Sequence, residues 1–127
     1  MTGAGDPVLD ASVDHGVVVI EIRGDADLTV TQSLRSRLDR LAADPGACVV
    51  VDLCEAEFID SSMLGALAFS AKAFGSPPSR FAICCPAGEV RTMFELTALE
   101  RVIPLHGTRA EALAFVRDES APGSPCR

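Results

Sequence analysis

The chain contains the stretch Phe58-Ile59-Asp60-Ser61-Ser62-Met63-Leu64-Gly65-Ala66-Leu67, in which a hydrophobic run ends at an acid and two hydroxyls before an apolar run begins. Upstream, Val49-Val50-Val51-Asp52-Leu53 predicts a buried strand, because consecutive β-branched residues suit a pleated core position. Short polar side chains at Asp60, Ser61 and Ser62 suit the first turn of a helix, where they accept hydrogen bonds from free amides. The stretch therefore predicts a strand, a loop and a helix that starts at Ser61.

Ser61 is open to two interpretations. Its hydroxyl can simply cap the helix, which is a common role of serine at this position. The same first turn carries unpaired N–H groups and the positive end of the helix dipole, so a phosphate on the hydroxyl would be stabilised there. The local pattern leaves both interpretations open.

The segments before this stretch predict a β-hairpin and a helix. Val17 to Arg23 is predicted as a strand that follows a shorter strand near Val8 to Val13, with a turn at Asp14-His15-Gly16. A helix from Thr29 or Thr31 to Ala43 comes next, because its leucines share one face. These leucines are Leu34, Leu38 and Leu41.

The segments after Ser61 continue the alternation of helix and strand. They predict a helix over Ser61–Phe74, a strand over Arg80–Cys84, a helix over Gly88–Leu96, a strand over Val102–Leu105 and a helix over Arg109–Arg117. The fold class is therefore α/β, with a mixed, mostly parallel sheet of about five strands and about four helices packed on it. We expect one domain over residues 1–118 and a flexible C-terminal tail over 119–127.

Three motifs resemble elements of the STAS-domain anti-sigma factor antagonists. Asp60-Ser61-Ser62-x-Leu64-Gly65 resembles the phosphorylation motif of that family. Gly24-Asp25-Ala26-Asp27-Leu28 is similar to its Gly-Glu-x-Asp element, and Phe94-Glu95-Leu96-Thr97-Ala98-Leu99 resembles its late helix and turn. The resemblance covers Val8 to Val116. The chain departs from the pattern at Met63, where family members most often have glycine.

This resemblance implies a regulator of transcription that acts by partner switching. The unphosphorylated protein binds an anti-sigma factor with serine kinase activity and releases a sigma factor, as in a stress response. Phosphorylation of Ser61 abolishes this binding, and a serine phosphatase restores it. In this scheme Ser62 is a cap or a minor acceptor, Asp60 orients the loop or contacts the kinase site, and Asp27 lines the docking edge. ATP belongs to the kinase, so the resemblance implies no catalytic residue and no cofactor in this chain.

The helix from Ser61 has a second apolar face besides the one that packs on the sheet. At 100° per residue this face carries Met63, Ala66, Phe69 and Ala73. A partner protein or a neighbouring helix would bury it, and the sequence leaves both open. With the family resemblance, we expect a partner-binding surface of Asp27, Asp60, Ser62, Met63, Ala66 and Phe69.

Composition narrows the class of partner. The chain has 127 residues, a net charge of -7 and a single lysine, Lys72, which argues against a nucleic-acid interface. Its first residues lack the basic and apolar regions of a signal peptide, and its longest apolar run, Met63 to Phe74, is too short to cross a bilayer. We therefore expect a cytoplasmic protein with a protein partner and no membrane or nucleic-acid partner.

Cysteines and histidines give no sign of a metal site. None of the cysteines has CxxC spacing, and they are predicted as small core hydrophobes. The neighbours Cys84 and Cys85 should point to opposite faces of a strand. His15 and His106 have no ligand partner at a suitable spacing, so both are expected at the surface. The cysteines are Cys48, Cys54, Cys84, Cys85 and Cys126.

Two other function classes remain as alternatives. The first is a STAS module that is never phosphorylated and serves as a scaffold or ligand sensor in a larger signalling complex. The second is a small α/β hydrolase or thiol enzyme, which needs a base near its nucleophile. No histidine lies in sequence near Ser61 and there is no Gly-x-Ser-x-Gly elbow, although a distant histidine can fold close to a serine.

Overall fold

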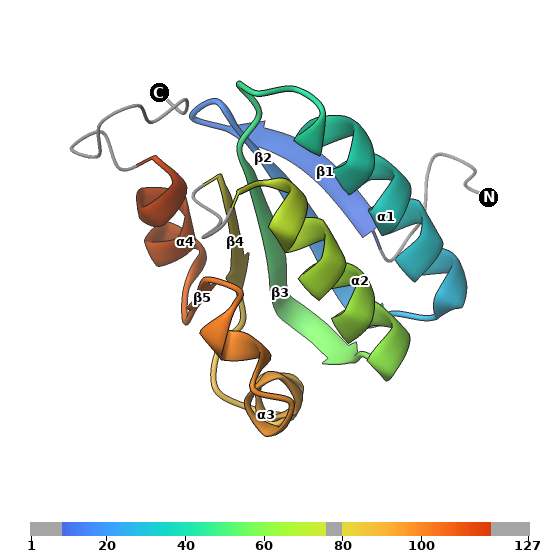
Figure 1. Ribbon diagram of the computed structural model, residues 1–127. Coiled ribbons are helices and arrows are strands. Elements are labelled where there is room, and N and C mark those ends of the chain that lie inside the picture. Colours follow the sequence, from blue (N-terminus) through green and yellow to red (C-terminus); the bar gives the residue numbers. More distant parts are fainter. Residues whose placement is uncertain (1–8, 76–79, 118–127) are drawn as a thin grey trace.

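The computed structural model describes residues 9–75 and 80–117 (Figure 1). In chain order its elements are β1 (Leu9–Asp14), β2 (Val17–Asp25), α1 (Leu28–Ala42), β3 (Val49–Phe58), α2 (Ser61–Ala73), β4 (Phe81–Cys84), α3 (Glu89–Leu96), a short 3₁₀ helix (Leu99–Arg101), β5 (Leu105–His106) and α4 (Arg109–Val116). The α/β fold class predicted from the sequence is confirmed. The predicted tail over 119–127 lies outside the described residues.

The strands form one five-stranded sheet in the order β1-β2-β3-β4-β5. β1 and β2 are antiparallel and the remaining neighbours are parallel, as the alternation of strands and helices predicts. The turn between β1 and β2 has positive φ angles at His15 (53°) and Gly16 (83°), which is typical of a tight hairpin.

Helices cover both faces of the sheet. α1 and α2 lie side by side across one face, where the larger core contains Leu34, Val51 and Leu67 (Figure 1). α3 adds Phe94 to this core, whereas α4 packs against β3 and β4 on the other face through Ala112. Cys84 and Cys85 point to opposite faces, as expected, because they belong to different clusters.

Three strands differ in length from the prediction by two residues or more, and one of them is β2, which continues to Asp25 rather than ending near Arg23. β3 continues to Phe58 rather than ending near Leu53, because its last residues pair with the end of β2 while the acids Glu55 and Glu57 stay exposed. β5 contains only Leu105 and His106, since Pro104 before it has no amide to donate to a strand neighbour. Within residues 9–75 and 80–117, no helix combines the length and the apolar character that crossing a membrane requires.

Candidate functional site

The carboxyl ends of β2 and β3 meet at one edge of the sheet. Asp25 at the end of β2 pairs with Phe58 at the end of β3, and the amide of Ala26 donates a 3.0 Å hydrogen bond to the carbonyl of Phe58. α1 begins at Leu28 and α2 at Ser61, so the two helices start beside each other. The structure thus brings together the two loops that carry the predicted site residues.

Asp60 is the cap of α2. Its Oδ1 accepts a 3.0 Å hydrogen bond from the amide of Met63. Ser61 and Ser62 are the first two residues of the helix, and both are exposed. In the part of the chain that the structure describes, neither hydroxyl has a hydrogen-bond partner. The capping role proposed for Ser61 therefore falls to its neighbour, and the Ser61 hydroxyl is open to solvent.

Asp27 has the same role at the start of α1. Its Oδ1 accepts a 3.0 Å hydrogen bond from the amide of Val30, and its carbonyl accepts one of 3.1 Å from the hydroxyl of Thr31. The residue is exposed. The two aspartates expected at the docking edge are therefore both helix caps at the same edge of the sheet.

A groove of about 430 Å³ runs between the first halves of α1 and α2. Ser61 and Ser62 line one end of it and Phe69 the other. The guanidinium carbon of Arg35 lies 5.3 Å from the centre of the Phe69 ring, which is a cation–π contact. Among the described residues that line the groove, Arg35 carries the one charge.

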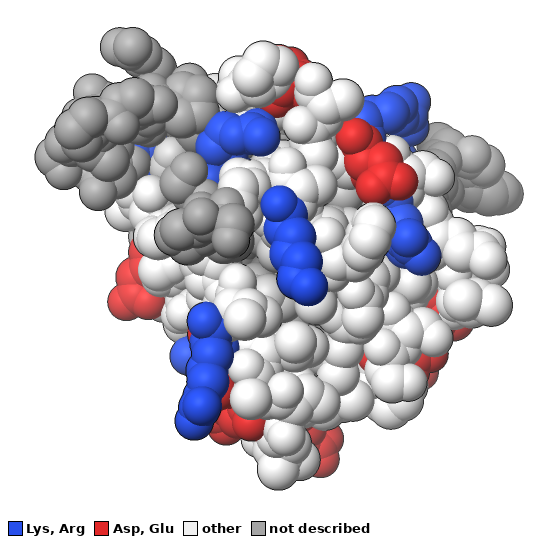
Figure 2. Space-filling view, viewed as in Figure 1, with Lys and Arg blue, Asp and Glu red and all other residues white. Residues whose placement is uncertain are grey.

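The predicted partner-binding residues of α2 differ in exposure. Met63 is 0% exposed and Ala66 is 5% exposed, whereas the side chain of Phe69 is 60% exposed. The second apolar face of the helix is thus partly covered within the domain and partly open, so this conformation presents Phe69 rather than Met63 to a partner. Figure 2 shows that much of the face with α1 and α2 is uncharged, with scattered basic side chains, one of them near the middle of the view.

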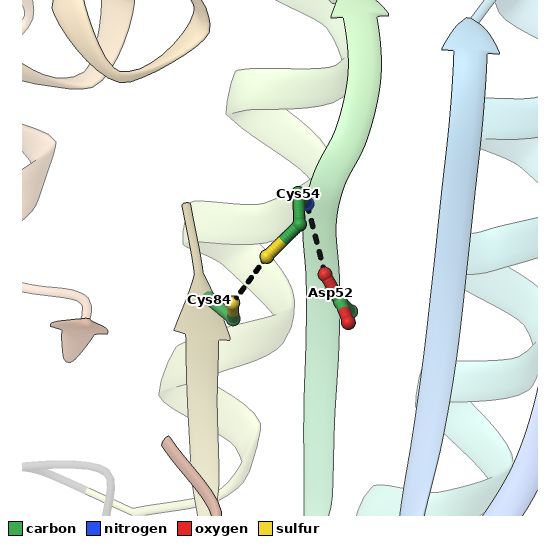
Figure 3. Close-up of side chains that lie close together, drawn as sticks. All are labelled: Asp52, Cys54 and Cys84. Carbon is green, nitrogen blue, oxygen red and sulfur yellow. Dashed lines mark hydrogen bonds between the residues drawn. The ribbon is translucent and has the colours of Figure 1, made fainter. Parts of the chain in front are cut away.

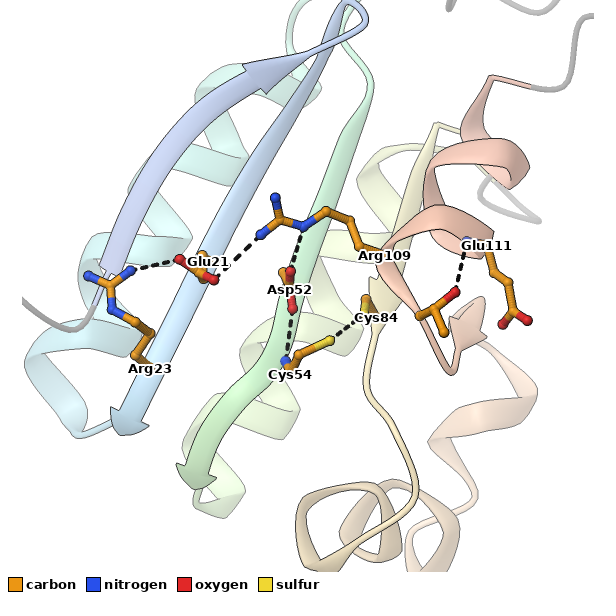
Figure 4. A network of polar contacts seen from close by, with 8 residues as sticks. Glu21, Arg23, Asp52, Cys54, Cys84, Arg109 and Glu111 are labelled. Atoms are coloured by element: carbon orange, nitrogen blue, oxygen red, sulfur yellow. Dashed lines mark hydrogen bonds and ion pairs between the residues drawn. The ribbon is translucent and has the colours of Figure 1, made fainter.

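A polar network lies on the opposite face of the sheet and extends from the start of α4 across β3 to β2 (Figure 4). Asp52 is 2% exposed, and its Oδ2 accepts a 2.7 Å hydrogen bond from Nε of Arg109. A second nitrogen of Arg109 lies 3.4 Å from Glu21, which is also paired with Arg23 at 2.7 Å. The charges of these acids and bases alternate across β2, β3 and α4.

Burial and hydrogen bonds shift the pKa values in this network, in opposite directions at Asp52 and in the same direction at Cys84. Burial alone would raise the pKa of Asp52, but hydrogen bonds from Cys54 and Arg109 outweigh it and hold the pKa below its usual value. Burial raises the pKa of the Cys84 thiol, and the contact with Cys54 raises it further. Burial is also the main reason why the pKa of Cys54 is raised. Both thiols are therefore protonated at neutral pH.

Local sequence patterns only partly indicate this network. Asp52 stands inside an otherwise hydrophobic run, and a buried acid of this kind indicates a hydrogen-bonded or charged partner. Nothing local to Asp52 points to Arg109, however, because the two are far apart in sequence. The expected surface position of His106 was also wrong in part, since its Nε2 is buried and lacks a hydrogen-bond partner among the described residues.

The chain is similar to proteins of a known class. A family model for the STAS domain matches residues 9–112. The anti-sigma-F factor antagonist RsfB of Mycobacterium tuberculosis is 30% identical over 115 residues, which cover 90% of this chain and 93% of that protein. A solved anti-sigma factor antagonist from Mycobacterium paratuberculosis has a TM-score of 0.75 and 28% identity, over 87% of this chain and 93% of that one. The phosphorylated form of SpoIIAA from Bacillus shares the fold, with a TM-score of 0.66 and 20% identity over 86% of this chain and 99% of that one.

Proposed function

This chain belongs to the STAS domain family, and on that premise we propose that it is an anti-sigma factor antagonist: it binds an anti-sigma factor and thereby releases a sigma factor. The anti-sigma factor carries serine kinase activity and phosphorylates Ser61. Phosphorylation ends the binding, and a serine phosphatase restores it. The cycle takes place in the cytoplasm, and ATP is bound by the kinase rather than by this chain.

One observation supports Ser61 as the phosphate acceptor. Its hydroxyl is exposed and free at the first position of α2, because Asp60 provides the side-chain cap of the helix. A kinase can therefore reach the oxygen without breaking a hydrogen bond of the fold. Phosphate at this position is stabilised by the positive end of the helix dipole and by the unpaired amides of the first turn.

The groove between α1 and α2 is the proposed docking surface. It combines the exposed ring of Phe69 with the charge of Arg35, and aromatic and arginine side chains are frequent anchors of protein interfaces. Ser61 lines the same groove, so a partner that covers the groove also covers the acceptor. The partner that docks in the groove therefore has access to Ser61, and the phosphate that it adds lies within the surface that it binds.

The charge of the phosphate explains the release of the partner. A phosphoserine adds about -1.5 to -2 charges at pH 7, next to the carboxylate of Asp60. A docked partner would either take this charge out of water, which costs free energy, or be repelled by it. Both effects weaken binding. A loss of about 3 kcal/mol in binding free energy lowers the affinity about a hundredfold, which is enough for a switch.

Phosphopeptide analysis of the protein from its native host, in growing and in stressed cells, tests this proposal. We expect phosphate at Ser61 with an occupancy that changes with growth condition and disappears in Ser61→Ala. Ser62→Ala is the matched control and should keep the modification. An absence of phosphate under every condition would instead favour the STAS module that serves as an unphosphorylated scaffold.

A binding measurement separates the antagonist role from phosphorylation. Ser61→Ala should capture an anti-sigma factor from a lysate of the host, and Ser61→Asp should bind the same protein at least tenfold more weakly. Because the carboxylate of aspartate carries less charge than a phosphate, a smaller effect than that of true phosphorylation is expected. Equal affinity of both variants would contradict the proposed mechanism.

A further inference from the structure

Two cysteine side chains and one carboxylate converge between the middle of β3 and the carboxyl end of β4 (Figure 3). Sγ of Cys54 lies 2.7 Å from Sγ of Cys84. A carboxylate oxygen of Asp52 and the two sulfur atoms all lie within 4.8 Å of one another. Spacing along the sequence did not reveal this group, because its members come from two strands.

An irregularity of β3 creates the convergence. Asp52 pairs with Cys84 of β4 on one side and with Glu21 of β2 on the other. Beyond Asp52 the pairing with β2 shifts by one residue, which is typical of a β-bulge. At this shift the amide of Cys54 donates a 2.8 Å hydrogen bond to Oδ1 of Asp52, and the side chain of Cys54 turns toward Cys84.

We propose that Asp52, Cys54 and Cys84 bind one thiophilic divalent cation of the zinc class. Thiolate sulfur and carboxylate oxygen are both ligands of zinc, and three protein ligands leave a fourth position for water. This site lies on the face of the sheet opposite the groove between α1 and α2. It is therefore independent of the proposed binding of an anti-sigma factor.

The arrangement requires only a small movement to accept a metal. Sulfur ligands at about 2.3 Å from a tetrahedral zinc ion lie about 3.8 Å apart, so the present sulfur–sulfur distance must open by about 1 Å. Cys84 is fully buried, but Cys54 is only half-buried and can rotate outward. Cys54 also lines a pocket of about 320 Å³ beside α3, which gives a metal ion a path from solvent.

Charges and hydrogen bonds around the ligands suit a divalent cation. Arg109 holds Asp52 through a 2.7 Å hydrogen bond, and metal-binding carboxylates commonly have such a partner. The carboxylate oxygens retain lone pairs for a metal beyond those used by Arg109 and Cys54. When the metal binds, two Sγ–H bonds break, their protons pass to the solvent, and two sulfur–metal bonds form without change of oxidation state. The two thiolates then balance the charge of the cation.

A Cys54–Cys84 disulfide is the competing outcome of the same proximity. It would form when an oxidant such as a peroxide removes two electrons from the thiols, whose two protons are released. In a disulfide Asp52 has no role, whereas a metal site needs it as a ligand. The two possibilities therefore differ in their dependence on Asp52 and on reducing conditions.

Titration of the reduced full-length protein with Zn²⁺, against a chromophoric chelator, tests the proposal. We expect one Zn²⁺ per chain, and with Cd²⁺ a near-ultraviolet thiolate charge-transfer band. Cys54→Ser and Cys84→Ser should each lower the Zn²⁺ affinity at least tenfold and reduce this band. Cys85→Ser is the matched control, because Cys85 is equally buried but points to the other face, and it should leave both readouts unchanged.

Further variants keep the test decisive if Cys84→Ser folds poorly. Cys54→Ser changes a half-buried side chain and should fold, and Asp52→Asn keeps the size of the carboxylate. Arg109→Lys should lower Zn²⁺ affinity about tenfold without changing the thiolate band, since it acts through Asp52. Absence of stoichiometric binding by reduced protein, or binding that survives Cys54→Ser and Asp52→Asn, would overturn the proposal. A disulfide that peptide mass spectrometry locates between Cys54 and Cys84 before reduction, together with no Zn²⁺ binding after reduction, would assign the pair to disulfide formation instead.

Discussion

Arg109 follows Asp52 by 57 residues, yet its Nε donates a 2.7 Å hydrogen bond to the Asp52 carboxylate. This contact joins the first residue of α4 to the middle of the central strand. It supplies the positive charge for an acid that is almost completely buried. The contact therefore helps to hold α4 on the sheet, beside the apolar packing of Ala112 and Val116.

Replacement of Arg109 by methionine should destabilise the protein by about 2 kcal/mol. Breaking a fully buried ion pair costs about 3–5 kcal/mol, and we expect a smaller loss here because Arg109 is partly exposed. The loss arises because Asp52 keeps its charge without a partner. Urea unfolding of Arg109→Met, of Asp52→Asn and of the double variant measures the coupling. We expect the double variant to be more stable than the sum of the single losses implies. Strict additivity would show that the two side chains do not interact.

Asp60→Ala should lower the free energy of unfolding by about 1 kcal/mol, because the Met63 amide loses its acceptor. Asp60→Asn should remain close to the wild type, since asparagine is also a good cap. Ser61→Ala should change stability by less than about 0.5 kcal/mol, as expected for a surface residue outside the cap. A large loss in Ser61→Ala would mean that the serine, and not Asp60, caps α2.

Met63→Gly, which installs the residue that the family resemblance leads us to expect here, should destabilise the protein by about 3 kcal/mol. Loss of a buried side chain leaves a cavity, and glycine also has a lower helix propensity than methionine. Thermal unfolding measures the effect, and Gly65→Ala, at an exposed position of the same helix with open space around it, is the control. Equal stability of Met63→Gly and the wild type would show that the core can close around the missing side chain.

Phe69→Ala should weaken binding of the anti-sigma factor captured with Ser61→Ala by at least tenfold, or about 1.4 kcal/mol. Stability should change little, because most of the ring is exposed. Leu96→Ala, at a more exposed apolar residue on α3, is the matched control and should bind normally. Titration calorimetry with the purified partner measures both variants. Normal binding by Phe69→Ala would place the docking surface elsewhere.

The lowered pKa of His106 predicts a loss of stability in mild acid. Burial lowers its pKa from 6.5, with Glu111 opposing this shift and Arg91 adding to it. The unfolded chain therefore binds a proton below about pH 6.5 that the folded protein does not yet bind, so stability falls as the pH drops through this window. Thermal unfolding between pH 7.5 and pH 5.5 should show this decline, and His106→Gln should flatten it. An unchanged slope in the variant would assign the decline to other groups.

Local patterns in the sequence predicted most of the fold and both loops of the candidate site. The β-branched run before Asp52 and the leucine stripe of α1 each indicate, from neighbouring residues alone, which side chains are buried. For this reason both elements could be predicted. β3 was predicted too short because Glu55 and Glu57 look like loop residues, and only pairing with β2 shows that they belong to a strand. The burial of Met63 and the contact of Asp52 with Arg109 depend on tertiary packing, which no local pattern reports.

The order of the strands in the sheet is the same as their order in the chain. A ribosome therefore delivers each strand next to the one that it will pair with, and no strand has to be inserted between two that are already paired. The nascent chain can build the sheet in the direction of synthesis. α4 is the last of the described elements to be synthesised, so the contact between Asp52 and Arg109 can form only when translation of the domain is almost complete.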